Sequence, residues 1–281
     1  MIWYSFFMKT FHEFEHEGWQ LVADEYHDYF GALTSQSISS LVDSLKLQPG
    51  MAVLDIASGP GYVARELAAR AMRVTAVDFS SVMVETARKL NPDITFEEGD
   101  AHHLQFPDDT FDAACMNFGI LHLESPEVAL KEAHRVLKKN STTRFAFSAW
   151  TSRDESVAFG LVLDAIEKHG DAKVPIPPGP PFFRFGDPSE CERVLKETGF
   201  QHIQINKVKM SWHLDSVDDL FTAFYGGTPR TGGLLRAQNS QDFQAVKDAV
   251  TSAAAKYVVG NHLEIPMACL VASGVASESL R

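Results

Sequence analysis

The stretch that decides the fold is VLDIASGPGY, residues 53–62. An apolar strand runs into Asp55 and is followed at once by a turn that contains Gly59 and Gly61. Glycine adopts turn conformations that other residues avoid and lets a ligand approach the main chain closely, and a helix that starts after such a turn presents unpaired N–H groups. The stretch therefore predicts a strand, a ligand-binding turn and a helix.

Two further segments repeat this arrangement. RVTAVDFS, residues 73–80, is an apolar run that ends at Asp78, and ITFEEGDAHHLQF, residues 94–106, carries Asp100. In a doubly wound sheet, ligands bind beyond the carboxyl ends of the parallel strands. We therefore expect Asp55, Asp78 and Asp100 to converge on one crevice.

Strand-like runs alternate with helical segments along most of the chain, which is typical of a parallel sheet with helices on both faces. Apolar and aromatic residues at helical spacing over residues 11–46 predict helices before the sheet. After Trp150 the alternation changes, and a proline-rich loop occupies residues 174–188. The predicted elements are strands 51–56, 72–77, 93–98, 111–117, 143–149, 201–210 and 263–273, and helices near 61–70, 80–89, 126–138, 154–169 and 189–198, with further helical material to about residue 258.

In this order, the glycine turn and the three carboxylates resemble the class I S-adenosylmethionine-dependent methyltransferases, especially their small-molecule, ubiquinone-biosynthesis-like branch. The resemblance covers residues 40–150 well and the rest more loosely. It implies an α/β fold with a Rossmann-like, doubly wound, seven-stranded sheet, mostly parallel with an antiparallel last strand. The implied parts are an N-terminal helical cap (1–46), an S-adenosylmethionine-binding core (47–150), and substrate-covering helical insertions with the final strands of the same domain (151–281).

The resemblance also assigns roles in binding the cofactor. Asp55 would orient the loop and hold the methionine end, and Asp78 would accept hydrogen bonds from both ribose hydroxyls. Asp100 would accept from the adenine amino group. The other residues assigned to the cofactor are Ala57, Ser58, Gly59 and Gly61 in the loop, Phe79, Val82 and Ala101 around adenine, Asn117 and Phe118 at a strand end, and Trp19 and Tyr26 as a lid.

The loop departs from the family pattern at one position. The first glycine of Gly-x-Gly-x-Gly is Ala57 in this chain. Alanine suffices where the backbone angles are ordinary, whereas a positive φ at this position would weaken binding.

The chemistry is expected after the strand that ends at Asn117 and Phe118. Relatives that methylate amide or nucleobase nitrogens carry an Asn/Asp-Pro-Pro-aromatic motif there, and this chain has NFGI, residues 117–120. Oxygen or carbon of a small metabolite is therefore the expected methyl acceptor. His122 is the candidate general base, because imidazole titrates near neutral pH. The alternative is that His122 only packs beside the next helix, and Arg230 is either a contact for an anionic substrate or a surface residue.

The charge composition disfavours two classes of binding partner. The chain has 281 residues with 37 acidic and 25 basic side chains, a formal charge of −12, which disfavours nucleic acid and anionic lipid. The densest basic run is Arg135, Lys138 and Lys139 at a predicted helix end, where cations also suit the helix dipole. The apolar start of the chain is too short for a secretory signal or a membrane span.

The cysteines and histidines predict neither disulfides nor metal. Cys115, Cys191 and Cys269 lack metal-ligand spacing, so we expect reduced, buried thiols and a cytoplasmic location. The adjacent His102 and His103 do not suit a shared metal, and no metal site is predicted. The oligomeric state is left open.

Two alternative functions stay open on the sequence alone. One is a regulatory or catalytically repurposed protein that keeps the cofactor crevice, because fold does not prove activity. The other is a nicotinamide-dependent oxidoreductase, although the chain lacks Gly-x-Gly-x-x-Gly and an evident Tyr-x-x-x-Lys arrangement.

Overall fold

The computed structural model of the protein describes residues 9–277, so the expectation about the start of the chain lies largely outside the described residues. A single sheet has the strand order β3-β2-β1-β4-β5-β8-β6. All neighbouring pairs from β3 to β5 are parallel, and β8 runs antiparallel between β5 and β6. The strands are β1 (Ala52–Ile56), β2 (Arg73–Asp78), β3 (Thr95–Glu98), β4 (Ala113–Asn117), β5 (Arg144–Trp150), β6 (Phe200–Leu214) and β8 (His262–Ala276), with a short β7 (Val258–Val259) beside β8.

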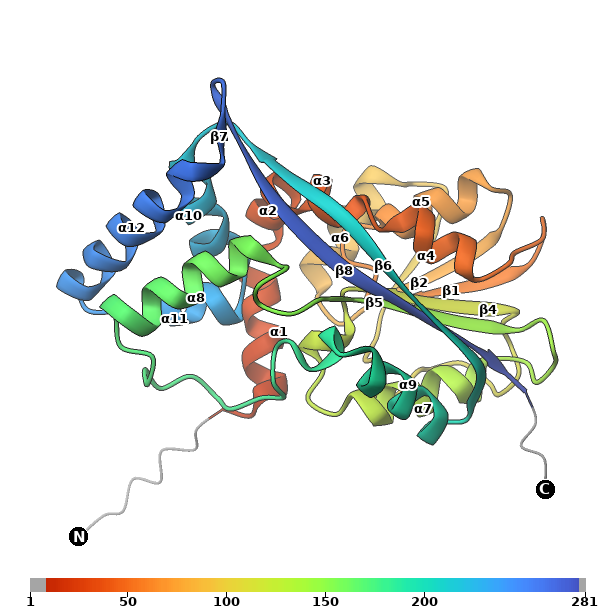
Figure 1. Cartoon of the computed structure of the whole chain (residues 1–281). Coiled ribbons are helices and arrows are strands. Elements are labelled where there is room, and N and C mark those ends of the chain that lie inside the picture. The colour runs from red at the N-terminus through yellow and green to blue at the C-terminus, as the bar shows by residue number, and fades with distance from the viewer. Residues whose placement is uncertain (1–8, 278–281) are drawn as a thin grey trace, which may run out of the picture.

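The predicted fold is confirmed. The borders of the strands from β1 to β5 lie within two residues of those expected. The last two long strands differ more: β6 and β8 pair from Phe200 and Ala276 to Leu214 and Leu263, well beyond the predicted ends. They form the long crossing pair of arrows in Figure 1. β7, which the sequence did not predict, adds an eighth strand of two residues.

Both faces of the central strands β1, β4 and β5 are buried, which explains their continuous apolar runs. Successive residues of β1 and β4 belong to different cores: Val53 and Ala113 lie in one, and Leu54 and Ala114 in the other. Figure 1 shows α4 and α5 on one side of the sheet and α7 and α9 on the other. With α6, the helices that flank the sheet are α4 (Ile38–Ser44), α5 (Tyr62–Ala69), α6 (Ser81–Leu90), α7 (Pro126–Val136) and α9 (Pro188–Glu197).

The remaining helices gather at one end of the sheet (Figure 1). They are α1 (Phe11–Leu21), α2 (Ala23–Glu25), a π-helix (Tyr26–Phe30), α3 (Gly31–Ser35), α8 (Val157–His169), α10 (Val217–Gly227), α11 (Arg230–Arg236) and α12 (Ser240–Ala254); single 3-10 turns lie at Ile120–His122, Arg184–Gly186 and Ala255–Tyr257. Among residues 9–277, no helix combines the length and the apolarity needed to cross a membrane.

Trp212 of β6 ties this helical end to the sheet. Its indole N–H donates to the main-chain oxygen of Tyr29 at 3.1 Å, and its ring lies 4.6 Å from that of Phe30 and 5.7 Å from that of Phe224. The side chain is almost completely buried. Segments far apart in sequence are thereby held together above the carboxyl ends of the parallel strands.

Candidate functional site

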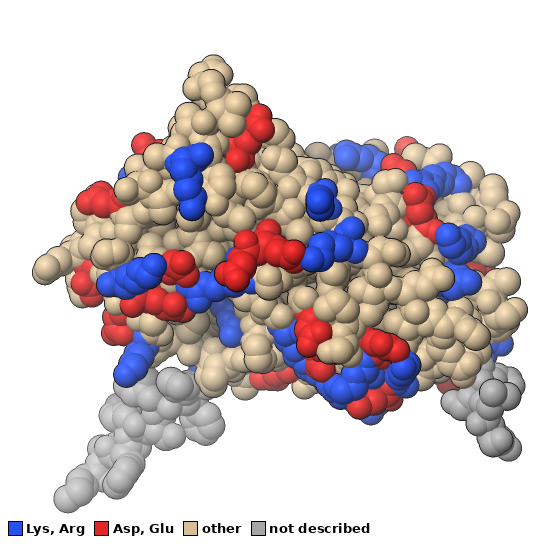
Figure 2. All heavy atoms as spheres, viewed as in Figure 1, with Lys and Arg blue, Asp and Glu red and all other residues tan. Residues whose placement is uncertain are grey.

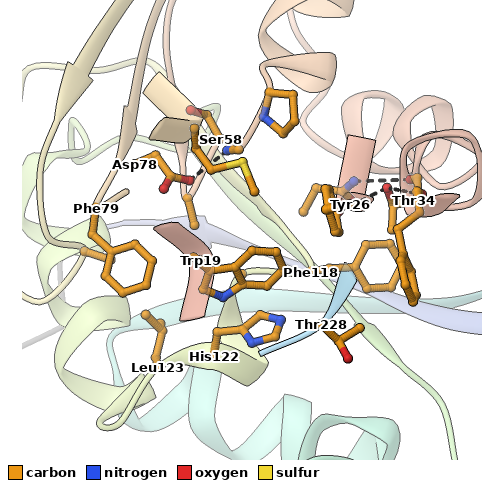
Figure 3. A pocket seen from close by; sticks show the side chains of 18 of the residues that line it. Trp19, Tyr26, Thr34, Ser58, Asp78, Phe79, Phe118, His122, Leu123 and Thr228 are labelled. Carbon is orange, nitrogen blue, oxygen red and sulfur yellow. Dashed lines mark hydrogen bonds between the residues drawn. The ribbon is translucent and has the colours of Figure 1, made fainter. Parts of the chain in front are cut away.

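One pocket lies at the carboxyl ends of β1, β2 and β4, under α1 and the π-helix. Figure 3 shows Trp19 between Asp78 and Phe79 on one side and Phe118 on the other, with His122 beside the indole. The predicted site residues that line the pocket are Trp19, Tyr26, Asp55, Ala57, Ser58, Gly59, Asp78, Phe79, Asp100, Ala101, Asn117, Phe118 and His122.

Two residues assigned to the cofactor, Gly61 and Val82, do not line the pocket. Gly61 instead caps α5 with φ of 83°, and a Cβ at this position would lie 2.7 Å from the ring of Phe96. The N–H of Val82 donates to the side-chain oxygen of Gln20 at 3.1 Å. Met83, which the sequence analysis did not select, lines the pocket.

The loop between β1 and α5 is held in a strained conformation. Ala57 has φ of 54°, the left-handed region that the sequence analysis identified as unfavourable for alanine. An alanine in this region costs about 1–2 kcal/mol. Its methyl group also fills the space beside Gly119, because a Cβ at Gly119 would lie only 2.6 Å from the Cβ of Ala57. The chain therefore pairs an alanine in the loop with a glycine after β4.

Asp55 is completely buried at the end of β1. Burial raises the pKa of its carboxyl to about 7, although the nearby backbone N–H of Ala64 offsets part of the rise. Oδ2 of Asp55 has no hydrogen-bond partner within the described chain, and the buried hydroxyl of Ser58 also lacks one. Two polar groups of the pocket wall are thus left to pair with a bound molecule.

Asp78 organises the loop from the end of β2. Its Oδ2 accepts from the N–H of Gly59 at 2.8 Å, and its Oδ1 accepts from that of Ser80 at 2.9 Å. Burial raises its pKa to about 6, while these hydrogen bonds and the nearby imidazoles of His122 and His16 lower it. Each carboxylate oxygen takes only one of these N–H groups and keeps acceptor capacity for a diol.

Asp100 is more exposed and already has a partner. Its Oδ1 accepts from the backbone N–H of His102 at 2.9 Å and pairs with Nδ1 of its ring at 2.7 Å. Burial raises the pKa of Asp100, but the hydrogen bonds from His102 outweigh it and the net pKa is lowered.

His12, Asp100 and His102 form a group whose ligand atoms lie within 4.8 Å of one another. It contains His102 but not the adjacent His103, in line with the expectation that these two histidines do not share a metal. Nε2 of His102 accepts from the N–H of Ser125 at 3.3 Å, so both nitrogens of this ring have partners. The expectation that the chain holds no metal stays a prediction.

Asn117 holds the scaffold around the pocket. Its side-chain oxygen accepts from the hydroxyls of Ser37 and Ser148 at 2.8 and 2.6 Å, and its amide donates to the main-chain oxygen of Thr34 at 3.2 Å. This network joins the start of α4 to β4 and β5. The side chain that was assigned to the cofactor is thus already used to position two strand ends.

His122 meets a carboxylate that the sequence analysis did not select. Nδ1 of His122 lies 2.9 Å from Oε2 of Glu15, a completely buried residue of α1, and Trp19 packs edge-on against the imidazole at 4.8 Å. Phe11, Glu15 and Trp19 are spaced by four residues and share one helix face. In the sequence, Glu15 could have been identified as a carboxylate on a helix face that is otherwise aromatic.

The half of the pocket opposite the three aspartates is lined mainly by aromatic side chains. Tyr26 lies there with its hydroxyl 3.3 Å from that of Thr34, and burial raises the pKa of this phenol. Arg230, for which the sequence left a substrate contact or a surface position open, also lines the pocket. It donates to the main-chain oxygen of Pro180 at 2.7 Å and lies over the ring of Phe11. The aromatic residues that line this half are Tyr26, Phe30, Tyr62, Phe118, Trp150, Phe159 and Phe182.

Comparisons with known proteins show that part of this chain is similar to methyltransferases. Residues 54–145 match a family model described as a methyltransferase domain. The demethylmenaquinone methyltransferase of Renibacterium salmoninarum is 40% identical over 98 residues, which cover 35% of this chain and 41% of that protein. The ubiquinone/menaquinone biosynthesis C-methyltransferase UbiE of Rhodopseudomonas palustris is 37% identical over 111 residues, covering 36% and 43%.

The crystal structure of the cyclase SpnF superposes with a TM-score of 0.61 at 16% identity and covers 96% of this chain and 98% of SpnF. This likeness shows the fold alone. It covers nearly the whole chain, whereas the family model covers only residues 54–145. The match to the two curated relatives spans only about two fifths of their length. The resemblance to class I methyltransferases seen in the sequence is confirmed.

The contact between Ala57 and Gly119 can be tested by substitution. Gly119→Ala is expected to destabilise the protein by about 1–3 kcal/mol, because the new methyl group meets Ala57 and Met116. Ala57→Gly relieves the positive φ and removes one of these clashes, so the double variant should recover part of the loss. Urea unfolding of the four proteins measures the coupling. If the change in unfolding free energy of the double variant equals the sum of the changes in the two single variants, the contact is contradicted.

Proposed function

We propose that this chain, whose core resembles a class I methyltransferase domain, transfers a methyl group from S-adenosylmethionine to oxygen or carbon of a small, flat, largely apolar metabolite. The observation that carries the proposal is a pair of buried polar groups, Oδ2 of Asp55 and Oγ of Ser58, that have no hydrogen-bond partner among residues 9–277. Both lie in the wall of a pocket that also contains Asp78. These groups require a polar ligand, and the aromatic half of the same pocket requires an apolar one.

The residues present suit the cofactor. Asp55 would pair with the amino group of its methionine end, and the free acceptor capacity of Asp78 would take the ribose hydroxyls. Phe79, Ala101 and Asp100 would surround adenine, with Asp100 already oriented by His102. When bound, the cofactor supplies a methyl group on a positively charged sulfur.

The acceptor would occupy the aromatic half. Its rings exclude water, so a positioned acceptor meets the methyl group in an apolar environment. His122 stands at the junction of the two halves, where a base is needed. The curated relatives are named for demethylmenaquinone and for C-methylation, which supports a hydroxylated or quinone-like ring as the acceptor.

The two alternative functions, a repurposed or regulatory protein and a nicotinamide-dependent oxidoreductase, have less support. SpnF is named a cyclase and shares the fold, so a repurposed chain is the second candidate. The carboxylate that faces His122 favours active chemistry over a regulatory role. The match to a methyltransferase domain disfavours a nicotinamide-dependent oxidoreductase.

A small-molecule partner also suits the surface. Arg135, Lys138 and Lys139 pair with Asp108, Asp112 and Asp109, so the basic run is neutralised. Figure 2 shows positive and negative side chains mixed on the face drawn. We therefore propose a protein that does not bind nucleic acid, and its free, buried cysteines suit the cytoplasm.

Binding of the cofactor product tests the ribose contact. S-Adenosylhomocysteine should bind in calorimetry, and Asp78→Asn should weaken its affinity roughly 5- to 100-fold through lost hydrogen-bond acceptance. Asp112→Asn, remote from the pocket, is the matched control. Equal affinity of wild type and Asp78→Asn would remove Asp78 from the ribose, and tighter binding of NAD would overturn the proposal.

Proton release tests Asp55. Its pKa is raised to about 7 in the free protein, so the carboxyl is largely protonated at pH 6. An amino group bound beside it favours the ionised form, and S-adenosylhomocysteine should therefore release protons at pH 6 but fewer at pH 8.5. Calorimetry in buffers of different ionisation enthalpy measures the release. Asp55→Asn should remove most of it, and a release that persists in Asp55→Asn would place the contact elsewhere.

Methyl transfer is the direct test of activity. Labelled S-adenosylmethionine is incubated with catechol, phenol, and demethylmenaquinone in quinone and hydroquinone forms. Label should appear in a hydroxylated ring, with one S-adenosylhomocysteine formed per methyl group. Cofactor binding without label in any acceptor of this set would favour the regulatory or repurposed alternative.

A further inference from the structure

The pair formed by Glu15 and His122 is costly to build. Glu15 is completely buried, its Oε2 lies 2.9 Å from Nδ1 of His122, and its Oε1 has no hydrogen-bond partner among residues 9–277. A buried carboxylate costs several kcal/mol unless it is compensated, and replacing such a pair by apolar side chains is often neutral or stabilising. Packing alone therefore does not explain a carboxylate at this position.

The pocket side of His122 is free. Within the described chain, Glu15 is the only recorded hydrogen-bond partner of its imidazole, and His122 lines the pocket between the cofactor half and the aromatic half. When the Nδ1–H group donates to Glu15, the lone pair of the ring lies on Nε2. An ionised carboxylate at Nδ1 also stabilises the imidazolium that forms when Nε2 takes a proton.

We propose that Glu15 is a positioning residue that fixes His122 as a general base, and that the acceptor is consequently a molecule that must lose a proton, such as a phenol or a hydroquinone. This inference rests on the proposed methyl transfer. The acceptor O–H bond breaks and its proton moves to Nε2. The electron pair left on the acceptor forms the new bond to the methyl carbon at oxygen, or at a ring carbon that then loses its own proton, while the methyl–sulfur bond breaks and its pair stays on sulfur.

The helix that carries Glu15 also covers the cofactor half of the pocket. Gln20 of α1 accepts from the hydroxyl of Ser80 at 2.8 Å and from the N–H of Val82 at 3.1 Å, at the start of α6. Trp19, between Glu15 and Gln20, packs against His122. One docked helix thus both seals the pocket and supplies the carboxylate. Two other titratable groups interact with this pair, Asp78 with His122 and Arg230 with Glu15.

The first experiment needs no acceptor. NMR of protein labelled at histidine, with and without S-adenosylhomocysteine, should show His122 as the Nδ1–H tautomer. Glu15→Gln keeps the shape but removes the charge, and its amide can donate as well as accept, so the Nε2–H tautomer of His122 should gain population at the expense of the Nδ1–H tautomer. Glu17→Gln, an exposed residue of the same helix, is the matched control. A tautomer ratio that is unchanged in Glu15→Gln would overturn the proposal.

The second experiment uses the best acceptor found. Glu15→Gln and His122→Asn should each lower kcat at least tenfold with little change in KM for S-adenosylmethionine, and the double variant should be no slower than His122→Asn alone. Multiplied losses in the double variant would contradict an action through His122.

The two proposals fail differently. If S-adenosylhomocysteine does not bind to wild type, the proposed function fails. If it binds and His122→Asn is slow while Glu15→Gln is as fast as wild type, only the role of Glu15 fails. Thermal unfolding separates a folding defect of Glu15→Gln from a catalytic one, because a variant that stays folded at the assay temperature and is still slow has lost catalysis rather than structure.

Discussion

The structure depends on the burial of carboxylates at the ends of strands that are apolar on both faces. Asp55 ends a strand whose other residues lie in two hydrophobic cores, and its side chain is completely excluded from water. Asp78 ends the neighbouring strand in similar burial. The free protein accommodates these groups by raising their pKa values and by donating backbone N–H groups to Asp78. A ligand that brings hydrogen-bond donors is the remaining source of compensation.

The second half of the pocket obeys a different constraint. Most of its aromatic walls come from the N-terminal helices, from β5 and from the chain after it. Trp212 of β6 is one of the contacts that hold the π-helix to the sheet. The same assembly brings Glu15 to His122 across 107 positions of sequence. We therefore propose that cofactor recognition resides in the parallel core, and acceptor chemistry where distant segments meet that core.

The core and its crevice could be predicted from the sequence because the signals are local. Parallel strands end at one edge of a sheet, so three strand-terminal aspartates had to converge, and Asp55, Asp78 and Asp100 do line one pocket. The positive φ of Ala57 could not be predicted, because alanine favours negative φ and the residue beside its methyl group, Gly119, is distant in sequence. The partner of His122 was missed for the same reason, since a buried glutamate on an aromatic helix face has meaning only when the helix is docked.

The central claim is that the strand-terminal carboxylates bind an adenosyl amino acid in this pocket. A crystal structure of the full chain with S-adenosylhomocysteine tests it most directly. The claim requires the amino group within hydrogen-bond distance of Oδ2 of Asp55 and the ribose hydroxyls on Asp78. A ligand seated away from these two side chains, with Oδ2 of Asp55 still unpaired, would contradict it.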